Sequence, residues 1–223
     1  MEDILKILLI IALFMLIPRW IWGQKTKQKI ALLKYKGIGQ ENVKKNWMDR
    51  ISFSNKNLNT DFARCPVGVE PADQAIFQYP FVYMDGAQVL ILTEAEKQNL
   101  REYTAAGGFL QIHVPEVRKA DFFSEINQIF PEAKKVKIEG DHPIFNQKYK
   151  FPEDFPYLQQ FYKKDLPVWG ITTEDRLCVC CESFERETEQ FKNTEMISLQ
   201  IVPEEILKIE ANILSYVFQN QCL

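Results

Sequence analysis

Apolar and polar positions follow two alternating patterns along this chain. Short continuous apolar runs predict strands of a sheet covered on both faces, and apolar residues spaced three or four apart predict amphipathic helices between them. The runs that predict strands are 30–35, 67–69, 81–84, 109–114, 168–172 and 177–181, with a short exposed segment at 136–138. The helical spacings occur at 41–53, 94–106, 122–130 and from 203 onward. This alternation predicts a three-layer α/β domain around a mostly parallel sheet.

Local signals mark several element boundaries. Thr93 and Glu96 form the pattern of a capping box at the start of a helix, which Gly107-Gly108 ends. Residues 173–176 are typical of a turn and predict a hairpin between the two strands that flank them. The stretch 140–167 contains four prolines among aromatic residues, so we expect a packed surface loop there rather than a helix.

The first 24 residues form a segment of their own. Residues 7–17 are eleven consecutive apolar positions, which is the length of a signal-peptide h-region. Glu2, Asp3 and the bulky Trp22 are unusual for a cleaved signal, so an uncleaved N-terminal hydrophobic helix of about 30 Å is the alternative. The sequence therefore predicts a signal peptide or membrane anchor at 1–24, followed by a single domain at 25–223.

Composition and charge bound the class of protein. The 223 residues are 46% hydrophobic with a formal net charge of -3, which predicts a globular body and gives no reason to expect a nucleic-acid partner. Residues 24–50 contain eight Lys or Arg against two Asp or Glu, whereas residues 51–223 contain 17 against 26. We expect an exported protein, either periplasmic or anchored to the inner membrane. By the positive-inside rule, the basic segment favours the alternative of an anchored domain that faces the cytoplasm.

Five cysteines and two histidines limit the chemistry further. No CxxC spacing occurs and two histidines cannot form a three-histidine site, so we expect no disulfide scaffold, no metal site and no cofactor. Cys178 and Cys180 are expected on one face of a strand, as small buried apolar residues. A redox or metal role for the 178–181 group is the alternative.

Several phrases in a characteristic order carry a resemblance over about 30–218. They are Leu33-Lys34-Tyr35, Tyr79-Pro80-Phe81-Val82-Tyr83-Met84, Asn99-Leu100-Arg101-Glu102-Tyr103, Gly107-Gly108-Phe109-Leu110, Phe130-Pro131, Asp141-His142-Pro143-Ile144-Phe145 and Ala211-Asn212-Ile213-Leu214-Ser215-Tyr216. In these the chain resembles the exported bacterial proteins grouped as domain of unknown function 4159. The resemblance implies a flavodoxin-like fold related to class I glutamine amidotransferases, usually behind a signal sequence, and implies no established activity.

The chain departs from this family where its members carry polar clusters. Met84-Asp85-Gly86-Ala87 stands where relatives typically have Thr-Gly-His-Gly, and Gln111-Ile112-His113-Val114 stands where paired aspartates are typical. The family's His-Glu-His-Asp run and its Gly-Asp-Gly-Trp-Glu-Asp loop are replaced near 159–162 and 184–188. The chain therefore looks like a divergent member of the family that has lost most of the polar cluster.

Two residues are weak catalytic candidates. Asp85 follows one strand and His113 lies near the end of another. The carboxyl ends of such strands form the ligand crevice of an open parallel sheet, so the two residues could act as an acid/base pair or as part of a metal site. A histidine satisfied within the core is the more ordinary interpretation of His113. Asp141-His142-Pro143 is expected to be a turn with a local side-chain cap, and the acidic run 182–189 a solvated loop.

These observations predict a non-catalytic binding or assembly module of the bacterial envelope. Its expected partners are an unknown envelope protein and, through the N-terminal segment, the membrane. No cysteine lies on the glycine-flanked elbow that amidotransferase chemistry needs. The alternative is a hydrolase or amidase-like enzyme that uses a crevice near Asp85 and His113.

Overall fold

The computed structural model describes residues 27–35, 40–163, 165–173, 175–184 and 204–219. Its strands are β1 (Ala31–Leu33), β2 (Val67–Val69), β3 (Phe81–Asp85), β4 (Phe109–His113), β5 (Lys135–Lys137), β6 (Val168–Thr173) and β7 (Arg176–Glu182). The α-helices are α2 (Gln40–Leu58), α3 (Glu94–Ala105), α4 (Lys119–Ile129), α5 (Pro156–Tyr162) and α6 (Glu204–Gln219). Short 3-10 helices are η2 (Gln74–Gln78), η3 (Glu116–Arg118) and η4 (Pro143–Phe145).

All seven strands belong to one sheet with the order β2-β1-β3-β4-β7-β6-β5. β1, β2, β3, β4 and β7 pair in parallel, while β6 and β5 continue the sheet antiparallel. Taken in chain order, the parallel strands therefore lie as 2-1-3-4-5, the order found in flavodoxin-type sheets. The prediction of an α/β fold with a mostly parallel sheet is confirmed.

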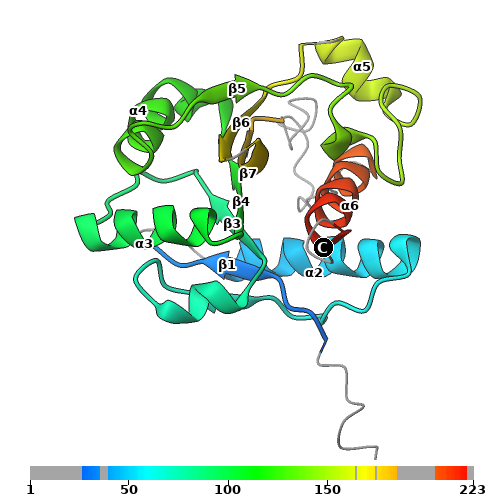
Figure 1. The fold of residues 1–223 in the computed structure, drawn as a ribbon. Coiled ribbons are helices and arrows are strands. Elements are labelled where there is room, and N and C mark those ends of the chain that lie inside the picture. The colour runs from blue at the N-terminus through cyan, green and yellow to red at the C-terminus, as the bar shows by residue number, and fades with distance from the viewer. Residues whose placement is uncertain (1–26, 36–39, 164, 174, 185–203, 220–223) are drawn as a thin grey trace, which may run out of the picture.

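Helices cover both faces of the sheet (Figure 1), an arrangement compatible with three layers. On one face, α3 and α4 pack over a core that includes Leu100, Tyr103, Phe122 and Ile126. On the other face, α2, α6, η4 and α5 enclose a second core, which contains Trp47, Ile51, Phe145, Leu158, Ile209 and Ile213. We call these the α3/α4 face and the α2/α6 face. Strands buried on both sides explain the nearly continuous apolar runs of β3 and β4.

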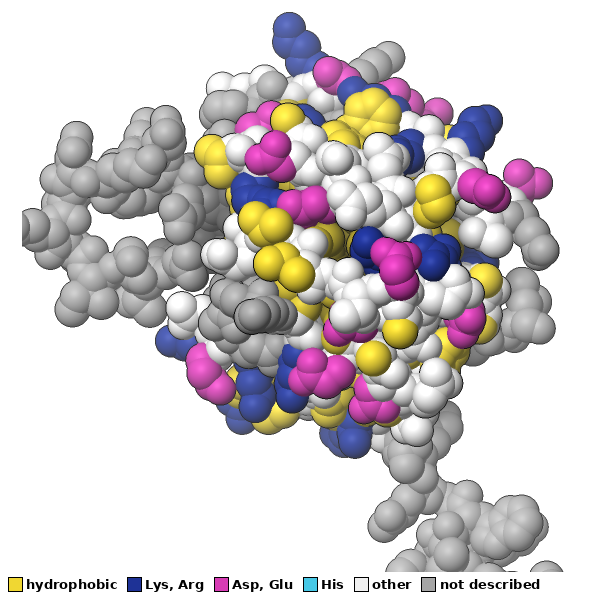
Figure 2. All heavy atoms as spheres, turned by 90° about the vertical axis from the view of Figure 1, so that its left-hand side faces the viewer, with side chains coloured by type: hydrophobic (Ala, Val, Ile, Leu, Met, Phe, Trp, Pro, Cys, Tyr) yellow, Lys and Arg dark blue, Asp and Glu magenta, His cyan; other side chains and the backbone are white. Residues whose placement is uncertain are grey.

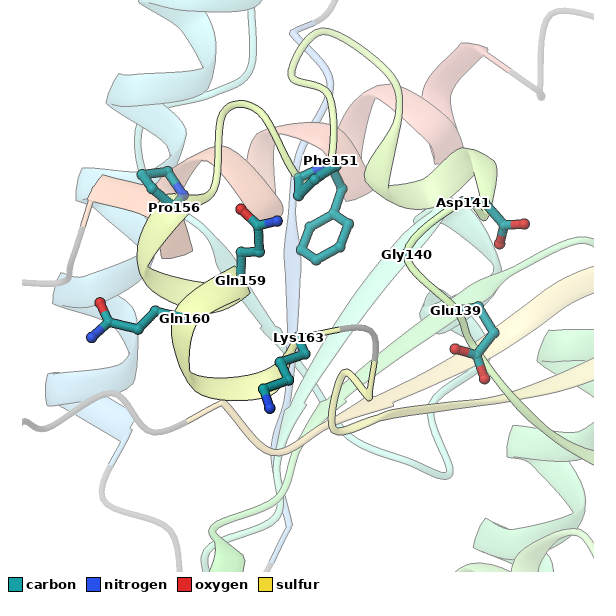
Figure 3. A pocket seen from close by; sticks show the side chains of 9 residues that line it. Glu139, Gly140, Asp141, Phe151, Pro156, Gln159, Gln160 and Lys163 are labelled. Carbon is teal, nitrogen blue, oxygen red and sulfur yellow. The ribbon is translucent and has the colours of Figure 1, made fainter.

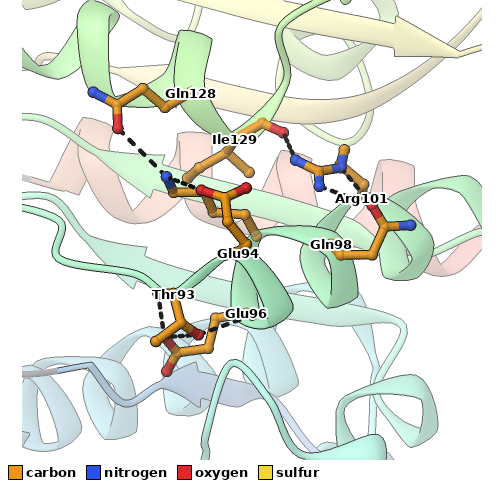
Figure 4. Close-up of polar contacts among 8 residues, drawn as sticks. Thr93, Glu94, Glu96, Gln98, Arg101, Gln128 and Ile129 are labelled. Atoms are coloured by element: carbon orange, nitrogen blue, oxygen red, sulfur yellow. Dashed lines mark hydrogen bonds and ion pairs between the residues drawn. The ribbon is translucent and has the colours of Figure 1, made fainter.

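Polar contacts on the outside of the α3/α4 face cap α3 and join it to α4 (Figure 4). Thr93 and Glu96 form the predicted capping box, in which Glu96 Oε2 accepts from the Thr93 N–H at 2.7 Å. Arg101 of α3 donates to the Ile129 carbonyl at the end of α4 at 2.7 Å. Acidic and basic side chains are interspersed on the outside of this layer, with hydrophobic side chains in small groups between them (Figure 2).

The stretch 140–167 contains helices that the sequence prediction missed. Its prolines permit a helix because Pro156 occupies the first turn of α5, where proline needs no N–H partner. Glu205 of α6 then caps α5, since its carboxylate accepts from the N–H groups of Tyr157 at 2.8 Å and Leu158 at 2.9 Å. That cap comes from a residue 47 positions further along the chain, so no local pattern reveals it.

Two finer expectations about strands are wrong. The segment 136–138 is not exposed, because Val136 and Lys137 of β5 are half-buried and Ile138 is only 2% accessible, with its N–H donating to the Val168 carbonyl. Cys178 and Cys180 do not share a face: Cys178 packs into the α3/α4 core and Cys180 into the α2/α6 core. The pairing of β6 with β7 has an irregularity between Ile171 and Thr172, and such a bulge changes the alternation of side chains. Both thiols are buried, as predicted.

Three of the sequence predictions concern residues that the structure does not describe. The expected leader at 1–24, Pro203 at the start of the last helix, and Cys222 lie outside the described residues. Among the residues described, no helix is both long and apolar enough to cross a bilayer.

Candidate functional site

The carboxyl ends of three neighbouring parallel strands place three ionisable side chains side by side. The register of β3, β4 and β7 pairs Asp85 with His113, and His113 with Glu182. Residues paired in this way in a parallel sheet point to the same face. We call Asp85, His113 and Glu182 the rim triad, although only two of its members contact each other through side chains.

His113 and Glu182 form the contact within the rim triad. His113 Nδ1 lies 3.1 Å from Glu182 Oε1 and 3.2 Å from Oε2, and Glu182 Oε2 also accepts from the Phe184 N–H at 3.2 Å. The Glu182 side chain is only 2% accessible, whereas that of His113 is 14% accessible. Of the two tautomers of a neutral imidazole, a carboxylate at Nδ1 favours the one with its proton on Nδ1, which leaves Nε2 as the acceptor. In the described part of the chain, His113 makes no other side-chain hydrogen bond.

The Asp85 side chain bonds to the backbone of its own turn and makes no hydrogen bond to His113. Its Oδ1 accepts from the Ala87 N–H at 3.0 Å, and its carbonyl accepts from the Tyr35 hydroxyl. Burial, followed by the negative charge of Asp85, raises the pKa of Tyr35, so this hydroxyl remains a donor. The next residue must be glycine because a Cβ on Gly86 would lie 2.7 Å from the His113 carbonyl oxygen. The structure thus brings Asp85 and His113 onto adjacent strand ends without joining their side chains.

A pocket of about 860 Å³ lies elsewhere on the molecule, between α5 and the loop that follows β5. We call it the α5 pocket. It is lined by Glu139, Gly140, Asp141, Phe151, Pro152, Pro156, Gln159, Gln160 and Lys163. The 139–141 loop forms one wall and α5 the other, with the Phe151 ring between them (Figure 3). None of the rim triad lines this pocket, and among the residues that the structure describes neither does any histidine, cysteine, serine or threonine.

A family model for a domain of unknown function, DUF4159, matches residues 29–218. The chain belongs to the DUF4159 family. The match covers the whole sheet and the helices on both of its faces. No curated protein matches the chain. The resemblance drawn from the phrases in the sequence is therefore confirmed at the level of the family.

Glu182 is the functional candidate of this DUF4159 domain that sequence reasoning misplaced. The acidic run 182–189 was expected to form a solvated loop, but Glu182 is the last residue of β7 and is buried. The register of β7 on β4 buries it, because it pairs with His113. The rest of that run, from residue 185, lies outside the described residues. An apolar run ending in a carboxylate is a usable signal only when the neighbouring strand is known to end in a base.

The thiols of the DUF4159 domain do not supply a nucleophile beside His113. Burial raises the pKa of Cys181 to about 12, with the charge of Glu182 as a second cause. Burial raises the pKa of Cys180 as well, so both thiols stay protonated at neutral pH. Cys65 is exposed and precedes Pro66, and no thiol or hydroxyl in the described residues hydrogen-bonds to His113. Across those same residues no group of three or more His, Cys, Asp or Glu side chains is arranged to hold a metal ion.

The second histidine has the structural role expected from its sequence. His142 is the N-cap of η4, and its Nδ1 accepts from the Ile144 N–H at 3.1 Å. Burial lowers the pKa of His142, while the nearby Asp141 charge opposes that shift. A neutral imidazole is what this cap requires, because a protonated Nδ1 cannot accept a hydrogen bond.

Proposed function

We propose that this DUF4159 chain is a non-catalytic binding module of the bacterial envelope, and that its ligand enters the α5 pocket. One observation carries the proposal. The described residues offer a pocket of ligand size whose described lining contains no cysteine, serine, threonine or histidine, and the His113–Glu182 pair lies outside that lining. Ligand pockets of about 300–1,000 Å³ with apolar walls and a few polar groups are typical of small-molecule sites.

The flavodoxin-like architecture that we infer for this chain supports a binding role in a second way. The strand order fits the flavodoxin-like architecture of class I glutamine amidotransferases that the resemblance implies. Amidotransferase chemistry needs an activated cysteine, and burial keeps Cys180 and Cys181 protonated. We therefore assign the architecture, but not the chemistry, to this chain.

The envelope location is part of the same proposal and rests on the apolar run 7–17. A reporter enzyme that is active only in the periplasm, fused after Leu223, tests it. Reporter activity supports export or outward anchoring, with an envelope protein as the expected partner. A silent reporter with full expression supports the alternative of an anchored domain facing the cytoplasm.

A hydrolase or amidase-like enzyme is the second candidate, and a specific observation favours it. A buried carboxylate that holds Nδ1 of a histidine, with Nε2 left to accept a proton, is the base-and-orienter part of nucleophilic hydrolases. The described residues provide no nucleophile for that base, so the binding module is the better-supported function.

A substrate panel separates the two candidates. Wild type and the Asp85→Ala/His113→Ala double variant are assayed on amides, esters and glutamine, with Glu182→Gln as a variant that keeps the size of the side chain. The binding module predicts no turnover above buffer for any of the three. Turnover in wild type that falls by roughly a hundredfold or more in the double variant would establish the enzyme instead.

A further inference from the structure

We propose that the α5 pocket binds a short peptide of two or three residues with both ends free and an apolar side chain. The N-terminal ammonium group would lie against Glu139 and the C-terminal carboxylate against Lys163. This inference rests on the proposed binding function and names the ligand of the same pocket.

Charges of opposite sign stand on opposite walls of the pocket, with Glu139 and Asp141 on one wall and Lys163 on the other. Glu139 lies on the loop after β5 and Lys163 at the end of α5, with the Phe151 ring between them (Figure 3). Both side chains are exposed, and in the described part neither forms an ion pair or side-chain hydrogen bond. Opposite charges separated by an apolar floor match a ligand that carries an ammonium group at one end and a carboxylate at the other.

The floor between those charges is aromatic and held in place. Phe151 packs against the rings of Phe145 and Phe155, with centroid distances of 6.5 and 6.1 Å. Its N–H donates to Asn146 Oδ1 at 3.2 Å. The ring lies close to Gly140, where an added Cβ would be 2.5 Å from the ring. A platform ordered before binding loses little entropy when the ligand arrives, so an apolar side chain has a ready place to pack.

The size of the pocket and its other lining residues limit further which ligand can bind. A pocket of about 860 Å³ is larger than one free amino acid requires and suits a ligand of two or three residues. Pro152 and Pro156 extend the apolar wall, and the Gln159 amide points toward Phe151, where it can bond to a peptide group (Figure 3). A neutral sugar would use the ring and the amide but not the paired opposite charges, so we favour the peptide.

Calorimetry on the full-length chain in detergent micelles tests the assignment with four probes. They are Leu-Phe, N-acetyl-Leu-Phe, Leu-Phe amide and maltose. We expect Leu-Phe to bind, and blocking either end to weaken binding roughly tenfold, the value of one charge-assisted contact. Maltose should bind at least tenfold more weakly than Leu-Phe.

Charge variants assign each end of the peptide to its wall. Glu139→Gln should weaken Leu-Phe roughly tenfold and leave N-acetyl-Leu-Phe unchanged, whereas Lys163→Met should weaken Leu-Phe and leave Leu-Phe amide unchanged. Glu153→Gln and Lys148→Met are matched controls, because both residues are exposed and neither lines the pocket. Both controls should bind Leu-Phe as wild type does.

Different results would overturn the peptide assignment and the proposal of a binding module. No heat with Leu-Phe at millimolar concentration, equal binding of the blocked peptides, or tighter binding of maltose overturns the peptide assignment. Each of these leaves the binding module standing if the substrate panel also shows no turnover. Turnover that depends on His113 overturns the module without changing the reading of the calorimetry.

Discussion

The two faces of the sheet bury different kinds of side chain. Among the described residues, the buried charged side chains are Arg50, Glu182 and Glu210, and all three lie on the α2/α6 face. The α3/α4 face buries only apolar side chains and uncharged polar ones such as Asn99 and Thr104. Since buried charges carry a desolvation cost of several kcal/mol each unless they are paired, the α2/α6 face depends on correct pairing in a way that the other face does not.

The pairing on the α2/α6 face leads from the helix layer toward the rim. Gln111 Nε2 donates to Glu210 Oε2 at 2.8 Å, and Arg50 Nε lies 3.6 Å from Glu210 Oε1. The Arg50 guanidinium also lies over the rings of Trp47 and Tyr83, at 5.1 and 5.8 Å from their centroids. Gln111 and His113 are two positions apart on β4 and share a face, so the buried network ends one step below the rim triad. The face that bears the candidate chemistry is thus the face that bears the buried charges.

Breaking this network should have the largest effect. Glu210→Ala leaves Arg50 and Gln111 buried without their shared partner, so we expect the free energy of unfolding to fall by about 3–5 kcal/mol. Urea denaturation followed by circular dichroism measures it. Glu210→Gln keeps an oxygen that can accept from Gln111 and should lose clearly less. A loss of under about 1 kcal/mol for the alanine variant would mean that the network behaves like an exposed ion pair.

The matched substitution on the α3/α4 face should cost somewhat less. Ile126 of α4 is 1% accessible and packs in the hydrophobic core of this face, so Ile126→Ala creates a cavity and lowers the free energy of unfolding by about 2–4 kcal/mol. Ile126→Val removes a single methyl group and should lose about 1 kcal/mol. If the alanine variant on this face were more destabilised than Glu210→Ala, the proposed difference between the faces would be wrong.

This difference also explains what the sequence could and could not predict. The α3/α4 face follows local rules: the capping box at Thr93, the spacing of Phe122 and Ile126, and the stop at Gly107 all act within a few residues. The α2/α6 face depends on distant pairs, such as Gln111 with Glu210 and His113 with Glu182, which lie 99 and 69 residues apart. Two of the three rim residues, Asp85 and His113, could accordingly be found from strand ends, whereas the local pattern placed Glu182 in a loop.

The capping box at Thr93 gives a further test of the difference between the two faces, with a smaller expected loss of stability. Thr93→Ala removes the side-chain oxygen that accepts from the Glu96 N–H at 3.3 Å, so the first turn of α3 loses one satisfied donor. We expect a loss of about 1 kcal/mol by urea denaturation, with Thr93→Ser close to wild type. The contact is local, so its cost should add to that of Ile126→Ala. Strong non-additivity would mean that the α3/α4 face is coupled as tightly as the other.

The smallest effect should come from the titration of His142, which ties η4 to the α2/α6 face through ring contact with Tyr216. Burial lowers its pKa in the folded chain, so the unfolded chain binds the proton more readily. The stability that His142 contributes is therefore complete above its ordinary pKa of about 6.5 and is lost as the pH falls through the range below it.

His142→Asn isolates this contribution because asparagine caps a helix start well and does not titrate. Urea denaturation of both proteins from pH 8 to pH 5 should give a constant difference in stability at the upper end, and below about pH 6.5 wild type should lose stability relative to the variant. All other titratable groups are the same in both proteins, so their contributions cancel in the difference. Parallel pH profiles would show that the cap survives protonation, in which case Asp141, whose charge opposes the lowered pKa, must compensate the burial of His142 in full.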